Sequence, residues 1–106
     1  MMNANVLMVF VSCPPAKCEK LARSLIEDRL AACVNIIPAA KSVYRWKQKV
    51  RVDTESLLVI KTTSARFKAL KTAVLKRHPY ELPEVIAVKM ARGHRPYLKW
   101  IIESCE

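Results

Sequence analysis

The chain of 106 residues is 52% hydrophobic and 26% charged, which is typical of a globular protein with one core. We therefore expect a single domain over residues 1–106. With one glycine, Gly93, the chain cannot build a glycine-rich phosphate loop or a dinucleotide fingerprint. The formal net charge of +10 favours acidic partners, but the basic residues are spread along the chain without a long block, so we expect no nucleic-acid site.

The start of the chain lacks the basic leader of a signal peptide, and the apolar run Val6–Val11 is far too short to cross a bilayer. We expect a cytoplasmic protein without a membrane partner. The four cysteines form no Cys-x-x-Cys pair, so we interpret them as free thiols in a reducing compartment. They are Cys13, Cys18, Cys33 and Cys105.

Val6–Val11 predicts a strand buried on both faces, because it is a continuous apolar run that ends at turn residues. A helix follows from Pro15, with apolar residues at three- and four-residue steps between Leu21 and Leu30. Ala32–Ile37 predicts a second strand, and the proline in Pro38–Ala40 indicates an edge strand or a bulge.

The strand pattern resumes over Ser42–Val52 with sharp alternation, and Asp53-Thr54 is the expected turn. One face of this segment should carry Arg45, Lys47, Lys49 and Arg51, and the other Tyr44, Trp46, Gln48, Val50 and Val52. Two large aromatic residues, Tyr44 and Trp46, next to an exposed stripe indicate a partner surface.

Glu55–Thr63 predicts another strand buried on both faces, and Ser64 is the expected N-cap of a helix that stops at His78-Pro79. Val85–Met90 predicts the fourth strand, and Pro96 opens a final helix. The helix after Ser64 should bury Phe67, Leu70, Val74 and Leu75. The final helix contains Tyr97, Trp100, Ile101 and Cys105.

The order of these elements predicts an α+β, ferredoxin-like βαββαβ fold, with an antiparallel sheet, helices on one face and a C-terminal helix. The middle strands are long for so small a sheet, so Ala32–Thr63 should project as a two-stranded β-hairpin arm. Because an isolated two-stranded arm is marginally stable in water, we expect the arm to pack on another subunit.

Several motifs together resemble the CutA divalent-cation tolerance proteins. These motifs are Leu30–Asn35, Ser42-x-Tyr44-x-Trp46, Ile60-Lys61-Thr62, His78–Glu84 and Tyr97-Leu98-x-Trp100. The resemblance implies a ferredoxin-like fold, a homotrimer with intersubunit arms, kinship with PII signalling proteins, no enzymatic activity and a role in the response to copper and other divalent metals. The chain departs from the family at Gln48, where a glycine is common, and at Arg77, where a second histidine can precede His78.

Two sites follow as expectations. An inter-subunit pocket should be lined by Tyr44, Trp46, Lys61, Tyr80, Glu84 and Trp100. Lys61 and Glu84 should be neighbours in adjacent strands, as a pocket feature or as an ordinary ion pair. His78 and Cys13 could bind copper, which prefers imidazole and thiolate, although a histidine at a helix end is more often a capping residue.

The expected function is a trimeric divalent-cation tolerance protein that binds copper or another divalent cation weakly, with no essential cofactor. The alternative is a PII-like scaffold that binds a small anionic ligand through Lys61, Arg77 and Lys89. An RNA-recognition module would need stacking aromatics on its central strands, where Phe10 is the only ring. An acylphosphatase would need free backbone N–H donors after the first strand, where Pro14 and Pro15 lack them.

Overall fold

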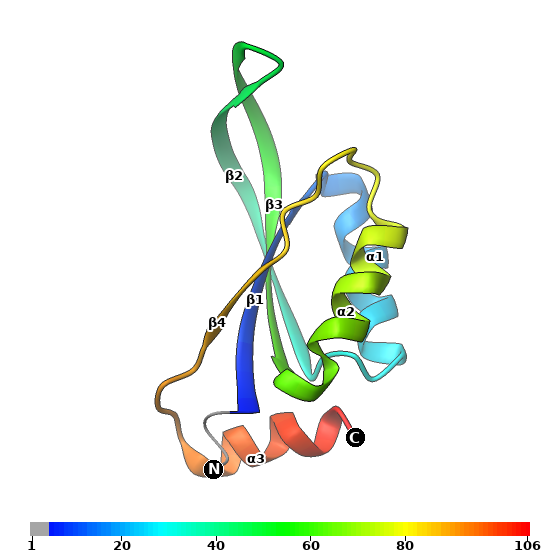
Figure 1. Ribbon diagram of the computed structural model, residues 1–106, viewed down its shortest axis with the longest axis vertical. Coiled ribbons are helices and arrows are strands. Elements are labelled where there is room, and N and C mark those ends of the chain that lie inside the picture. The colour runs from blue at the N-terminus through cyan, green and yellow to red at the C-terminus, as the bar shows by residue number, and fades with distance from the viewer. Residues whose placement is uncertain (1–4) are drawn as a thin grey trace.

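The computed structural model describes residues 5–106, which form an antiparallel four-stranded sheet with three helices (Figure 1). The elements are β1 (Val6–Cys13), α1 (Pro15–Glu27), β2 (Cys33–Trp46), β3 (Lys49–Thr63), α2 (Ser64–Arg77), β4 (Ile86–Lys89) and α3 (Arg95–Ser104). The strand order is β2-β3-β1-β4, and every neighbouring pair is antiparallel. This arrangement confirms the predicted α+β, ferredoxin-like fold.

The core lies between the sheet and the two helices α1 and α2, which lie side by side against one face (Figure 1). In β1, Val9 and Val11 are fully buried, and Leu58 and Ile60 of β3 are fully buried beside them. Each such side chain stabilises the fold by roughly 1.5–3 kcal/mol through burial. The helices complete this core with Cys18, Leu21, Leu25, Leu70, Ala73 and Val74.

Apart from its end at Val6, where α3 packs, the opposite face of the sheet has no helix over it within residues 5–106 (Figure 1). Ile37, Ile86 and Val88 are 47%, 55% and 50% exposed. The paired residues on this face are only half-buried: Met8, Phe10, Ser12, Leu57, Val59 and Lys61. The prediction that Val6–Val11 and Glu55–Thr63 are buried on both faces is therefore wrong for the single chain, because only one layer of helices covers the sheet.

The β2–β3 hairpin projects beyond the helices as the expected arm and gives the molecule its long dimension of 44 Å (Figure 1). The arm reverses at Lys47 and Gln48, not at Asp53 and Thr54 as predicted. The φ angles of Lys47 and Gln48 are 51° and 68°, the left-handed values that a two-residue type I′ loop requires. Asp53 and Thr54 instead lie inside β3. The φ of 68° at Gln48 falls in the left-handed region that favours glycine, so this residue is strained.

This reversal also changes which side chains share a face of the arm. Tyr44 pairs with Arg51, and Trp46 pairs with Lys49. Directly opposed residues of an antiparallel pair point to the same side, so aromatic and basic residues share a face. The predicted single basic stripe is therefore wrong.

Pro38 coincides with an irregularity in β2, as its position predicts. The register shifts between Ile37 and Ala40, and Ala39 has a φ of 61°. β2 is also an edge strand of the sheet. Both features agree with a proline that cannot donate to a strand ladder.

The start of α2 differs by one residue from the prediction, and its end agrees with it. The N-cap is Thr63, whose hydroxyl accepts a hydrogen bond from the backbone N–H of Arg66 at 3.3 Å, so Ser64 is the first helical residue. The helix ends before His78-Pro79 as predicted, because the residue before a proline avoids the helical conformation.

Three apolar residues expected on helices α2 and α3 are more exposed than a core position would be. Leu75 is 48% exposed, so its predicted burial is wrong, and Tyr97 and Trp100 are 40% and 44% exposed. In α3, Leu98 and Ile101 face the sheet instead. Among residues 5–106, none of the helices has the length and apolar character needed to cross a lipid bilayer.

Candidate ligand groove

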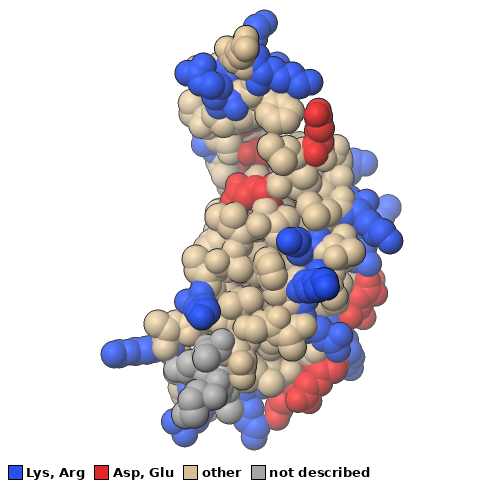
Figure 2. Space-filling view, viewed as in Figure 1, with Lys and Arg blue, Asp and Glu red and all other residues tan. Residues whose placement is uncertain are grey.

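A groove of about 840 Å³ lies between the arm and the turn that follows α2. The arm contributes residues 42–46 and 53–55, the turn contributes residues 80–82 and 84, and the end of β1 contributes Ser12. Figure 2 shows acidic residues gathered between the arm and the body, below the basic residues of the arm tip. The groove therefore joins parts of the chain that are distant in sequence.

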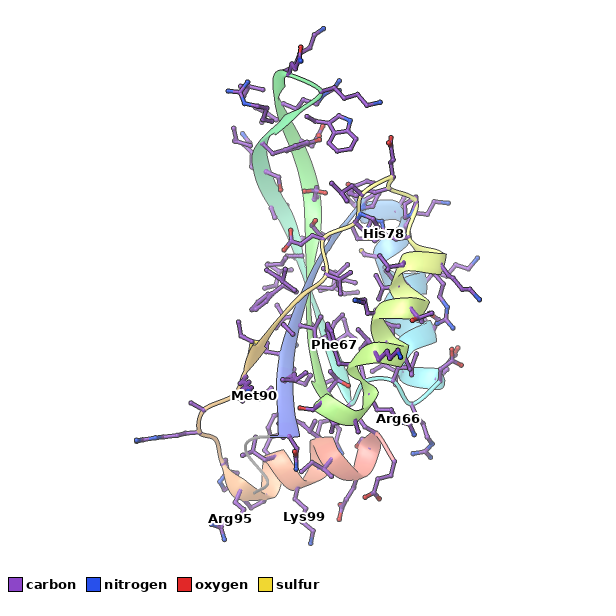
Figure 3. The ribbon with its side chains drawn as sticks, viewed as in Figure 1. Arg66, Phe67, His78, Met90, Arg95 and Lys99 are labelled. Carbon is purple, nitrogen blue, oxygen red and sulfur yellow. The ribbon has the colours of Figure 1, made fainter. Side chains whose placement is uncertain are left out.

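His78 lies where α2 ends (Figure 3), and its hydrogen bond to Ser12 anchors the turn to the end of β1. The imidazole is 7% exposed. Nδ1 accepts a hydrogen bond from the backbone N–H of Tyr80 at 3.1 Å, so the ring proton lies on Nε2, which donates to the carbonyl of Ser12 at 2.7 Å. Both ring nitrogens are thus engaged in holding the turn.

Tyr80 links the same turn to the arm. Its ring packs on His78 with centroids 4.6 Å apart, and its hydroxyl donates to Oε2 of Glu55 at 2.6 Å. Burial, and then the hydrogen bond to Glu55, raise the pKa of Tyr80 well above its ordinary value. Tyr80 therefore stays protonated as a donor to Glu55, a residue that is only 7% exposed.

The other carboxylates of the groove have mainly hydroxyl partners. Ser12 Oγ donates to Glu84 at 3.4 Å, and the Tyr44 hydroxyl donates to Asp53. Glu81 lies 3.9 Å from a lysine of the hairpin loop. Four of the nine acidic residues of the chain line this one groove, and among the described residues only Glu81 of these four has a cationic partner.

Four of the six predicted pocket residues meet in this groove: Tyr44, Trp46, Tyr80 and Glu84. Lys61 lies away from it and donates to Asn35, and Trp100 packs against Tyr97 in α3 with centroids 5.5 Å apart. β1 separates β3 from β4, so the prediction that Lys61 and Glu84 are neighbours in adjacent strands is wrong. The placement of the pocket between subunits stays a prediction.

The predicted copper ligands lie near each other but do not form a ready metal site. Cys13 is fully buried, and burial, together with nearby Cys18 and Glu55, raises the pKa of its thiol to about 11. Copper binds the thiolate and a free imidazole nitrogen, whereas here the thiol stays protonated and both nitrogens of His78 are hydrogen-bonded. Within residues 5–106, no three His, Cys, Asp or Glu side chains converge to hold a metal ion.

Among the groove residues that sequence reasoning missed are three that form side-chain hydrogen bonds there: Ser12, Asp53 and Glu55. Asp53 was assigned to a turn and Glu55 to the start of a strand, because the non-glycine loop at Lys47 and Gln48 carried no turn signal. An alternating pattern continued back from Glu55 would have placed both acidic residues on the arm.

Comparison with known proteins identifies the family of the chain. The sequence profile of the family described as "CutA1 divalent ion tolerance protein" matches residues 7–104. Human protein CutA is 47% identical over 96% of this chain, which spans 58% of the human protein's length. The divalent-cation tolerance protein CutA of Thermus thermophilus is 49% identical over 79% of this chain and 82% of that protein.

Solved structures show the same fold. CutA from Xylella fastidiosa is 40% identical, with a TM-score of 0.93 over 96% of this chain and 99% of that chain. The PII-like protein CutA from Nostoc is 30% identical, with a TM-score of 0.90 over 94% of this chain and 97% of that chain. The fold is thus the ferredoxin-like fold of the PII-like proteins. The chain belongs to the CutA1 divalent-ion tolerance family.

Proposed function

We propose that this chain forms a homotrimer that takes part in the response to divalent cations. The family supports the cation response, because relatives such as the Thermus protein carry the name divalent-cation tolerance protein. The observation that carries the assembly is the open sheet face, where Ile37, Ile86 and Val88 are about half exposed. A contiguous apolar face of this kind is typical of a protein interaction surface.

The assembly is tested by placing one charge on the open face. Val88→Lys should shift the particle toward monomers in light scattering, because a lysine on a buried interface is costly. Leu75→Lys is the matched control, since Leu75 on α2 is 48% exposed and lies outside the open face. A wild-type monomer, or equal effects of the two substitutions, would contradict the proposed interface.

We further propose that copper or another divalent cation binds weakly at Cys13 and His78. Weak affinity follows because binding requires loss of a thiol proton and of a hydrogen bond of His78. Titration with Cu(I), Cu(II) and Zn(II) tests the site, with His78→Ala and Cys13→Ser expected to abolish binding. Binding that survives both substitutions would place the metal elsewhere.

The second candidate, a PII-like scaffold for a small anionic ligand, is favoured by the similarity to the PII-like Nostoc protein. Two of the three cationic residues expected to bind the anion in this chain already have partners. Arg77 lies 2.6 Å from Asp28, and Lys61 donates to Asn35. ATP titration beside the metal titrations separates the two functions. Selective nucleotide binding would favour the scaffold.

We also propose that the protein is not an enzyme and acts in the cytoplasm. The hydroxyls of Ser12, Tyr44 and Tyr80 in the groove are hydrogen-bonded to carboxylates, which suits binding. The free thiols suit a reducing compartment. Fractionation with antibody detection tests the location.

A further inference from the structure

We propose that the groove between the arm and the turn after α2 binds an organic ammonium ion, of the size of a short aliphatic diamine. This binding site goes beyond the proposed function, because it requires neither a bound metal nor the proposed trimer. A volume of about 840 Å³ lies in the range of small-molecule sites.

The charge of the groove opposes the charge of the chain. The chain carries a formal +10, whereas the groove is lined by four carboxylates and one guanidinium, that of Arg45. Its formal charge is therefore −3. A concave surface of one sign concentrates ligands of the opposite sign, so this groove attracts cations and repels anions.

Glu55 supplies the innermost carboxylate. It is 7% exposed, and the Tyr80 hydroxyl satisfies only Oε2. Within the described residues Oε1 has no hydrogen-bond donor. Every fully enclosed side-chain oxygen in this part of the chain has a hydrogen-bond partner, so Oε1, which has none, is not fully enclosed. Oε1 is thus an unpaired acceptor that is not fully enclosed, on a largely buried residue that lines the groove. An ammonium group gains a charge-assisted hydrogen bond at such a position.

The aromatic walls favour an organic cation over a metal ion. Tyr44, Trp46 and Tyr80 line the groove, and aromatic faces attract ammonium groups by cation–π interaction. A divalent metal needs several oxygen ligands converging on one point, which these carboxylates do not provide among residues 5–106.

The chain already binds an ammonium group of its own in this manner. Nζ of Lys47 lies 5.7 Å from the ring centroid of Trp46 and 3.9 Å from Oε1 of Glu81. This exposed lysine bridges an aromatic ring and a carboxylate at the rim of the groove, and a ligand amine would make the same pair of contacts deeper inside.

The experiment uses Trp46 as its reporter. In a Trp100→Phe background, Trp46 is the only tryptophan, and its fluorescence is followed during titration with 1,4-diaminobutane at low ionic strength. The neutral isostere 1,4-butanediol and MgCl₂ are the controls. A saturable change with the diamine alone supports the inference, whereas no change, or equal changes with the diol or Mg²⁺, overturns it.

Charge-removing variants locate the site. Glu55→Gln should weaken diamine binding about tenfold, since it removes one charge-assisted hydrogen bond while its amide oxygen can still accept from Tyr80. Glu84→Gln, at an exposed position, serves if Glu55→Gln fails to fold. Glu103→Gln on α3 removes the same charge outside the groove and should leave binding unchanged.

Equal weakening by Glu103→Gln and the groove variants would show a general field effect and overturn the site. Light scattering on the same samples distinguishes a failure of the diamine site from a failure of the proposed trimer. If the protein is a trimer and does not bind the diamine, only the diamine site is refuted. If it is a monomer and binds the diamine, only the proposed assembly is refuted.

Discussion

Removal of the Tyr80 hydroxyl tests the connection between the turn after α2 and the arm. Tyr80→Phe keeps the ring on His78 and deletes only the donor to Glu55, which lies 2.6 Å away. A hydrogen bond to a charged group contributes about 1.5–3 kcal/mol. Because water reaches Glu55 from the groove and replaces part of the bond, we expect a loss of about 1.5–2 kcal/mol in the free energy of unfolding.

The assay is urea unfolding at pH 7 and a fixed protein concentration, since an oligomer's stability depends on concentration. Tyr97→Phe is the matched control. Tyr97 is 40% exposed, and loss of its hydroxyl should change the free energy of unfolding by at most about 0.5 kcal/mol. Equal effects of the two substitutions would refute the claim that the Tyr80–Glu55 bond ties the turn to the arm.

The same bond predicts a pH dependence. The pKa of Tyr80 is raised above its unfolded value of 10.0, mainly by burial, so the folded state holds the phenol proton more tightly than the unfolded state. The stability from Tyr80 is therefore complete below pH 10 and is lost as the pH rises above 10. Tyr80→Phe should make the decline above pH 10 shallower, which urea unfolding at pH 9 to 11 measures.

Three further predictions concern the arm, α2 and the thiols. Gln48→Gly should stabilise the protein by up to about 1 kcal/mol in urea unfolding, because glycine adopts a φ of 68° without strain; a loss of stability would contradict the left-handed loop. Thr63→Ala should cost about 1 kcal/mol and Ser64→Ala far less, since Thr63 holds the N-cap hydrogen bond; the reverse order would restore Ser64 as the cap. Iodoacetamide at pH 8 should alkylate half-buried Cys33 much faster than Cys13, which is fully buried and whose pKa is raised to about 11. Mass spectrometry that finds Cys13 modified first would show that the core around Cys13 opens.

The order of elements was predictable because its signals are local. The apolar run from Val6, the three- and four-residue spacing after Pro15, and the proline after His78 each act within a few residues of chain. Pro38 likewise predicted the bulge that the register shift confirms. Periodicity and backbone restriction therefore determined the fold class before any contact was known.

The position of the hairpin turn was not predictable in this way. Lys47 and Gln48 take left-handed φ angles that favour glycine or asparagine, so the loop looks like ordinary strand in the sequence. The strain is tolerated because the long pairing of β2 with β3 determines where the chain must reverse. A long-range constraint overrides the local preference.

The sequence by itself determined the order of the strands and helices, the presence of an arm and the rigid turn at His78. Only the tertiary structure decided that Glu55 and Asp53 join Tyr80 and Glu84 in one acidic groove. The physical reason is that hydrogen-bond partners and burial depend on strand register and on contacts between distant segments, which no local pattern records. For the same reason the structure, and not the residue types, showed that the two nitrogens of His78 hold the turn in place.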